Sequence, residues 1–147
     1  CGVFLCLYLD IHLHNGIILK AYTPSSVLLF INLFVENIKF TFSSELVVHL
    51  HGTSDGVLPY NGNNDWNSVQ STLDHWINFN NTVLTPTITS DNNIERYVYD
   101  QGDSSVSVEH YKFIGGDHVW FSATYQGQST SEIVWNFVSR YDINGLR

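Results

Sequence analysis

The sequence predicts an α/β domain in which a strand, a helix, a second strand and a second helix follow one another along a mostly parallel sheet. Two runs with strand patterns, each ended by a loop that contains glycine, alternate with two amphipathic helices that carry N-terminal capping residues. At 147 residues and 44% hydrophobic composition, the chain is long enough for one such domain with a hydrophobic core.

The first predicted strand is the compact run ELVVHLH, which ends at Gly52. A short run of apolar and β-branched residues is typical of a strand that is covered on both faces, as in a parallel sheet. The turn that follows is rich in glycine and proline and places Asp55 directly after the strand. Asp55 therefore stands where parallel sheets carry their functional loops, beyond the carboxyl end of a strand.

The first predicted helix begins at Asn67, which can cap it together with Gln70 three positions later. The polar, turn-rich residues 82–93 that follow the helix predict a surface excursion, with a short strand at residues 94–100. The apolar face of the helix has helical spacing and consists of Val69, Leu73, Trp76 and Ile77.

Residues 106–114 alternate between two faces and predict a second strand, near an edge of the sheet, that leads into the loop GGDHVW with His118. Ser129 and Glu132 have the spacing of a capping box at the start of the closing helix. The apolar stripe of that helix consists of Ile133, Val134, Phe137, Val138 and Tyr141.

The two loops can meet. If the two strands are parallel neighbours, their loops project from the same edge of the sheet and bring Asp55 next to His118. A carboxylate that accepts a hydrogen bond from an imidazole fixes the tautomer whose other nitrogen takes a proton from a serine. The alternative for Asp55 is a turn aspartate bound to its own backbone, and for His118 a loop histidine held by backbone groups.

The motif HGTSDGVLPYNG, the later GGDHVW and the terminal SEIVWNFVSRY together resemble the last third of polyhydroxybutyrate depolymerase-like esterases. These are secreted α/β-hydrolases related to feruloyl and acetylxylan esterases. The resemblance implies a partial α/β-hydrolase fold over residues 46–147, with Asp55 as the triad acid, His118 as the general base and Trp120 as a wall of the substrate site. It implies hydrolysis of a polyester, feruloyl or acetyl ester by a serine, without a metal or organic cofactor.

The sequence departs from this family in several places. No Gly-x-Ser-x-Gly motif occurs, so the nucleophile elbow of such hydrolases is missing. Phe121 and Ser122 follow Trp120 where the family usually has Pro-Gly, and the cysteines that many relatives carry after the first helix are absent. Residues 1–45 are apolar and carry no motif. We therefore expect them not to be the family's own N-terminal sequence, and the isolated chain to turn over little or no substrate.

Composition argues against two classes of partner. With 14 acidic residues, six scattered basic residues and a net charge of −8, the chain is not expected to bind nucleic acid or an anionic membrane. Its apolar runs are shorter than the about 20 residues that span a bilayer. An incomplete hydrolase sheet would leave an unpaired edge, so we expect a tendency to self-associate.

Two other functions stay open. Aromatic residues make up 14% of the chain, which suits a non-catalytic remnant or module that contacts polymer or sugar surfaces, and Trp120 can equally be a core residue. The two histidines of the first strand, together with an upstream pair of the same spacing, have the number of imidazoles that a metal site needs. These are His12, His14, His49 and His51, whereas His110 is interpreted as a bystander.

Overall fold

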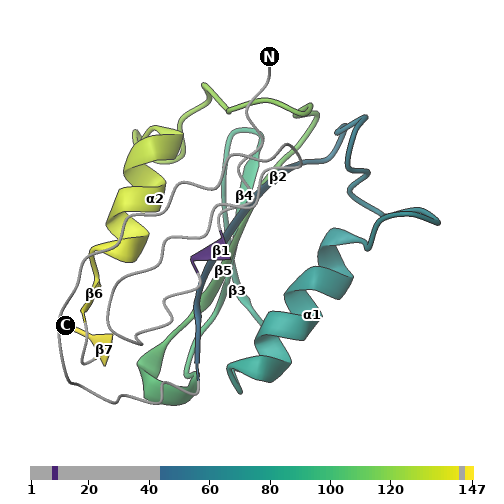
Figure 1. Cartoon of the computed structure of the whole chain (residues 1–147). Helices are drawn as coiled ribbons and strands as arrows, with labels where there is room; N and C mark the ends of the chain where they lie inside the picture. Colours follow the sequence, from purple (N-terminus) through teal and green to yellow (C-terminus); the bar gives the residue numbers. More distant parts are fainter. Residues whose placement is uncertain (1–7, 10–43, 143–144) are drawn as a thin grey trace, which may run out of the picture.

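The computed structural model describes residues 8–9, 44–142 and 145–147, and its main feature is a β-sheet between two helices (Figure 1). This arrangement confirms the predicted α/β class. The sheet has the strand order β1-β2-β5-β4-β3. Its strands are β1 (Tyr8–Leu9), β2 (Leu46–Gly52), β3 (Thr87–Asp91), β4 (Ile94–Tyr99) and β5 (Val108–Phe113). The remaining elements are α1 (Val69–Phe79), the 3-10 helix η1 (Asp103–Ser105), α2 (Thr130–Val138) and the pair β6 (Tyr141–Asp142) and β7 (Gly145–Leu146).

The central pair of strands is parallel, as predicted. Strands β2 and β5 lie side by side, with Val47 opposite Val108 and Gly52 opposite Phe113. The prediction of a mostly parallel sheet is wrong, because β1 pairs antiparallel with β2 and β4 pairs antiparallel with both β3 and β5. Strand β5 is therefore a central strand between β2 and β4, and the predicted position near an edge is wrong too.

The predicted excursion forms a hairpin. Strands β3 and β4 turn back on each other through Asn92, whose φ of 51° lies in the left-handed region that asparagine tolerates. Strand β3 ends the described sheet, and its first four residues are exposed. The self-association expected from an unpaired edge stays a prediction.

Both predicted helices form, with one shift of boundary. Helix α1 is capped by Ser68, whose side chain accepts a hydrogen bond from the Ser71 amide, and not by Asn67 as predicted. The capping box of Ser129 and Glu132 is confirmed at α2. Within the predicted α2 stripe, Ile133 and Phe137 are buried, Val134 and Val138 are partly buried, and Tyr141 lies in β6 beyond the helix.

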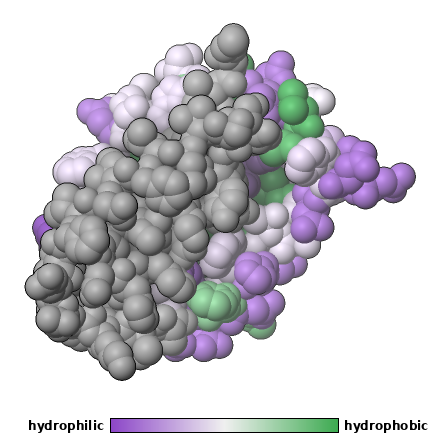
Figure 2. All heavy atoms as spheres, viewed as in Figure 1, coloured by the Kyte–Doolittle hydropathy of each residue, from purple (hydrophilic) through white to green (hydrophobic). Residues whose placement is uncertain are grey.

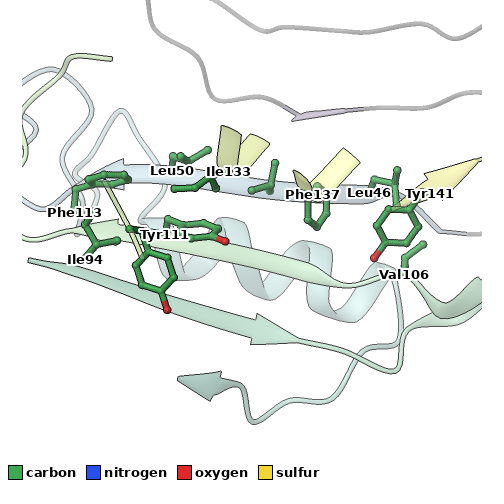
Figure 3. Packing of buried hydrophobic residues seen from close by; sticks show 11 residues of the cluster. Leu46, Leu50, Ile94, Val106, Tyr111, Phe113, Ile133, Phe137 and Tyr141 are labelled. Carbon is green, nitrogen blue, oxygen red and sulfur yellow. The ribbon is translucent and has the colours of Figure 1, made fainter. Parts of the chain in front are cut away.

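The side chains of β2 alternate between two hydrophobic clusters. Leu46, Val48 and Leu50 face α2, where they pack with Ile133 and Phe137 (Figure 3). The cluster on the α1 side consists of Val47, Val69, Leu73, Ile77, Tyr99 and Val108. Because each face of β2 is covered, all seven of its residues are buried, as its continuous apolar pattern predicted.

Several predictions concern residues that the structure does not describe. Most of the segment 1–45 falls in this part, including His12 and His14 of the suggested metal site. In the described ranges, no helix has the length and apolar character needed to cross a membrane. On the face seen in Figure 2, most described residues are hydrophilic or intermediate, and apolar residues gather in small patches.

Candidate active site

Asp55 and His118 lie side by side beyond the carboxyl ends of β2 and β5. The Nδ1 atom of His118 is 3.1 Å from both carboxylate oxygens of Asp55. The side chain of Asp55 is 4% exposed and that of His118 is 16% exposed, so the pair is largely shielded from solvent. The proximity predicted from the sequence is thus confirmed, and it follows from the parallel pairing of the two strands.

Backbone hydrogen bonds extend the parallel pairing into the two loops. The Thr53 amide donates to the Phe113 carbonyl at 2.9 Å, and the Ser54 amide donates to the Gly116 carbonyl at 2.9 Å. The Thr53 hydroxyl also accepts a hydrogen bond from the Gly115 amide at 2.8 Å. These hydrogen bonds join the two loops and hold Asp55 at a defined distance from the His118 loop.

Two glycines make this close approach of the loops possible. A Cβ atom on Gly52 would lie 2.2 Å from the carbonyl oxygen of Gly116, and one on Gly116 would lie 3.2 Å from the Cα of Gly52. The preceding Gly115 has a φ of 74°, which L-residues with a side chain rarely adopt. The Gly-Gly sequence before His118 thus has a structural reason.

The Asp55 carboxylate is held by its own turn as well as by His118. Its Oδ1 accepts hydrogen bonds from the amides of Val57 at 2.8 Å and Leu58 at 2.7 Å. The alternative interpretation, a turn aspartate bound to its own backbone, is therefore also correct. The two uses are compatible, because an ionised carboxylate offers about four lone-pair sites.

A neighbouring aspartate fastens the histidine to the same turn. Asp117 Oδ1 accepts a hydrogen bond from the His118 amide at 2.7 Å and a long one from the Gly56 amide at 3.5 Å. Because Asp55 only accepts when ionised, the hydrogen-bond network assigns the proton of a neutral His118 to Nδ1. In this tautomer Nε2 is the basic nitrogen of the ring.

A small pocket beside the pair is lined by both apolar and polar residues. Trp120 borders it and is 44% exposed, so it is not the core residue that the alternative interpretation allowed. The residues that line the pocket are Leu50, His51, Gly52, Asp55, Asp117, His118, Val119, Trp120, Phe121 and Thr130.

Phe121, which stands where the resembled esterases usually have proline, anchors the end of the His118 loop. Its ring stacks on Phe113 of β5 at a centroid distance of 3.8 Å and an interplanar angle of 7°. Its carbonyl oxygen accepts a hydrogen bond from the Thr130 hydroxyl at 2.8 Å, at the start of α2. The departure from the family's pattern therefore leaves this loop fixed to the core by other contacts.

The strand histidines form a buried network that the sequence did not predict. His49 Nδ1 lies 3.0 Å from His110 Nδ1, and His110 Nε2 lies 2.9 Å from the Tyr60 hydroxyl. His110 Nδ1 also lies 3.1 Å from the His49 carbonyl oxygen, so this nitrogen carries the donated proton and Nε2 accepts from Tyr60. The only signal in the sequence is that His49 and His51 stand two positions apart in one strand pattern. The register of His49 opposite His110 is known only from the structure.

The network gives no metal centre in the described part of the chain. There, no group of three or more His, Cys, Asp or Glu side chains is placed to hold a metal ion. His49 and His110 are 4% and 1% exposed and bind each other. His110, interpreted from the sequence as a bystander, is thus a central member of the network.

These buried imidazoles predict a loss of stability in mild acid. Burial lowers the pKa of His110 from 6.5 to about 4 and lowers the pKa of His49 well below its usual value. Between pH 6.5 and about pH 4, the unfolded chain binds more protons than the folded one, so falling pH favours unfolding. At pH 5, we expect His110 alone to lower the free energy of unfolding by about 2 kcal/mol relative to pH 7.5.

Urea denaturation followed by tryptophan fluorescence at the two pH values measures this effect. In a His110→Gln variant, which cannot take up the proton, the difference between pH 7.5 and pH 5 is expected to shrink by about 2 kcal/mol. His75 is exposed on α1, and His75→Gln serves as the matched control that keeps the full difference. An unchanged pH dependence in the His110 variant would contradict the prediction.

The site as a whole is an imidazole oriented by a shielded carboxylate, beside a small pocket with an aromatic wall. Such a pair can accept a proton from a hydroxyl group and return it to a leaving group. The serines upstream of Ser44 lie outside the described residues, and none of them has the glycine-flanked motif. Comparison of the chain with protein-family models, curated proteins and solved structures gave no match.

Proposed function

We propose that Asp55 and His118 are the acid and the general base of a serine-esterase-type catalytic triad, and that the protein acts in the hydrolysis of carboxylic esters. The observation that supports this function is the 3.1 Å contact of His118 Nδ1 with both Asp55 oxygens, beyond neighbouring parallel strands. The resemblance of the two loops adds the substrate class, a polyester, feruloyl or acetyl ester. It also implies a secreted protein.

In the proposed reaction, Asp55 keeps the His118 ring in the tautomer whose Nε2 is basic. Nε2 takes the proton of an attacking hydroxyl group while the oxygen of that group bonds to the ester carbonyl carbon. The imidazolium then gives the proton to the leaving alcohol, and water releases the acyl group by the same route. Trp120 is the proposed wall against which the substrate packs. The proposal assigns the acid and the base, and assigns the nucleophile to no residue.

Hydrolysis of p-nitrophenyl acetate and butyrate tests the proposal. We expect His118→Ala to lower the rate about 100-fold or more, because a general base contributes about 10²–10⁴-fold to such reactions. Methanol is added in a parallel series as an external hydroxyl group, since His118 should activate it in place of a serine. Formation of the methyl ester by the wild type, and its loss in His118→Ala, would support the assigned base directly.

The matched control is His75→Ala, a histidine exposed on α1 and outside the pocket, which is expected to keep the wild-type rate. Asp55→Asn is expected to lower the rate as well, because an amide can present its NH₂ group to the ring and so select the wrong tautomer. A wild type that releases no alcohol and transfers no acyl group to methanol would refute the esterase function. So would a His118→Ala variant with the wild-type rate.

The second candidate is a non-catalytic module that binds a polymer or sugar surface. It is favoured by three tryptophans with large exposed fractions, because exposed aromatic rings are common at such surfaces. These are Trp66, Trp120 and Trp135, which are 48%, 44% and 67% exposed. Cosedimentation with insoluble xylan or polyhydroxybutyrate, compared between the wild type and single Trp→Ala variants, would detect this function even where no ester is cleaved.

A further inference from the structure

His51 contacts the turn that contains Asp55. It is the last residue of β2 before Gly52 and is 8% exposed. Its Nε2 atom is 2.9 Å from the carbonyl oxygen of Leu58 and 3.5 Å from Asp55 Oδ2. Because a carbonyl oxygen can only accept, the Nε2–H group of His51 is the donor to Leu58. The 3.5 Å between His51 Nε2 and Asp55 Oδ2 is too long for a well-formed hydrogen bond, so this contact is electrostatic.

Both backbone polar groups of Leu58, its amide and its carbonyl, are hydrogen-bonded. Its amide donates to Asp55 Oδ1 at 2.7 Å, and its carbonyl accepts from His51. The contacts therefore form a closed ring, from the Asp55 carboxylate to the Leu58 backbone, to the His51 ring and back to the carboxylate. A change at His51 must reach the carboxylate through this ring.

The orientation of the carboxylate decides the orientation of His118. Both Asp55 oxygens are 3.1 Å from His118 Nδ1, a symmetric arrangement that a small rotation of the carboxylate would break. Without a donor at position 51, the Leu58 carbonyl loses its protein partner in a turn that is only partly buried, and the turn is held less firmly. The carboxylate is then held less firmly too.

We infer that His51 is a positioning residue of the Asp55–His118 pair, which fixes the Leu58 turn and thereby the carboxylate that orients the His118 ring. His51 takes no proton from the nucleophile in this role. It acts through Leu58 and Asp55. The inference rests on the proposed function for its catalytic meaning, whereas the contact itself can be tested without any substrate.

The test is the nuclear magnetic resonance signal of the proton on His118 Nδ1. A proton held between an imidazole and a carboxylate gives a resonance far downfield of the amides, and its absence in His118→Ala assigns it. In His51→Phe, which keeps a ring and removes the donor, we expect this proton to exchange with water about tenfold faster. In His51→Gln, which keeps an N–H donor, we expect near wild-type exchange.

His49→Phe is the matched control. His49 lies on the same face of β2 and is buried, but its hydrogen-bond partner is His110 and not the Asp55 turn. This variant is expected to lower the stability of the fold without changing exchange of the His118 proton. Urea denaturation of all three variants separates a general loss of stability from a local change at the site.

The outcomes distinguish this inference from the proposed function. Unchanged exchange in His51→Phe overturns it, and so does an equal acceleration in His51→Gln or in His49→Phe. Faster exchange in His51→Phe alone, in a protein that cleaves no ester and transfers no acyl group to methanol, supports the positioning contact and refutes the esterase. Ester hydrolysis that needs His118, with exchange unaffected by His51→Phe, supports the esterase and overturns the inference.

Discussion

A Gly52→Ala variant is expected to lose about 3 kcal/mol or more of its free energy of unfolding, the upper end of the range for overpacking. The added methyl group would lie 2.2 Å from the carbonyl oxygen of Gly116 and 3.0 Å from that of Asp117. Both are backbone atoms, which cannot turn aside as a flexible side chain can. To relieve the clash, the two loops must separate, and this moves Asp55 away from His118.

Gly56→Ala provides the matched control for this prediction. It places the same methyl group in the same loop, at a position where no atom lies within 4 Å. Its stability is expected to stay within about 0.5–1 kcal/mol of the wild type, because alanine restricts only the unfolded chain there. Urea denaturation compares the two, and the His118 Nδ1 resonance reports the local effect. Equal stability of both variants would contradict the close approach of the loops.

The elements predicted correctly from the sequence are those with a local signal. The capping box of Ser129 and Glu132 needs only residues three positions apart, and the buried strand at residues 46–52 is marked by its own composition. The contact between Asp55 and His118 also followed, because parallel neighbours place their loops at one edge. Each of these conclusions uses a short segment or a general rule of chain connection.

Apart from the α1 cap, predicted at Asn67 and found at Ser68, the errors concern pairing between distant segments. Strand β3 has exposed residues and no apolar alternation, so only its hydrogen bonds to β4 make it a strand. Strand β5 carries polar residues because Glu109 and His110 are buried with partners of their own. A buried strand with satisfied polar side chains has the alternating pattern of a half-exposed one, which led to the wrong prediction of a position near an edge.

In the site itself, the sequence predicts Asp55 and His118 but not the contacts that hold them in place. Asp55 and His118 stand out by their loops, whereas the contact of His51 with the Leu58 carbonyl depends on how the turn folds back. The fit of Gly52 against Gly116 likewise depends on two segments that are far apart in sequence. Such support contacts leave no periodic pattern, and only the coordinates locate them.

Loss of the Glu109 charge is the second change with a large expected effect. This carboxylate is 1% exposed on the α2 side of the sheet and is bound by two arginines. Arg96 of β4 donates to Oε2 at 2.9 Å, and Arg140, just after α2, binds Oε1. Glu109 therefore joins three segments: β4, β5 and the end of the helix that follows the His118 loop.

Breaking a buried ion pair costs about 3–5 kcal/mol when the remaining charge stays uncompensated. The side chains of Arg96 and Arg140 are 28% and 39% exposed, so they can turn partly into water and reduce this penalty. We therefore expect Glu109→Gln, which keeps the shape of the side chain, to lower the free energy of unfolding by about 2–3 kcal/mol. Urea denaturation at neutral pH measures the change.

The ion pair of Glu95 with Lys112 is the natural control, because it belongs to the same pair of strands but lies on their α1 side. Its atoms are 2.8 Å apart, and both side chains are more than a quarter exposed. Glu95→Gln is expected to cost no more than about 1 kcal/mol, since water already screens this pair. The contrast attributes the larger loss to burial and not to the number of hydrogen bonds. Similar losses in the two variants would show that Glu109 is no more important to the fold than a surface charge.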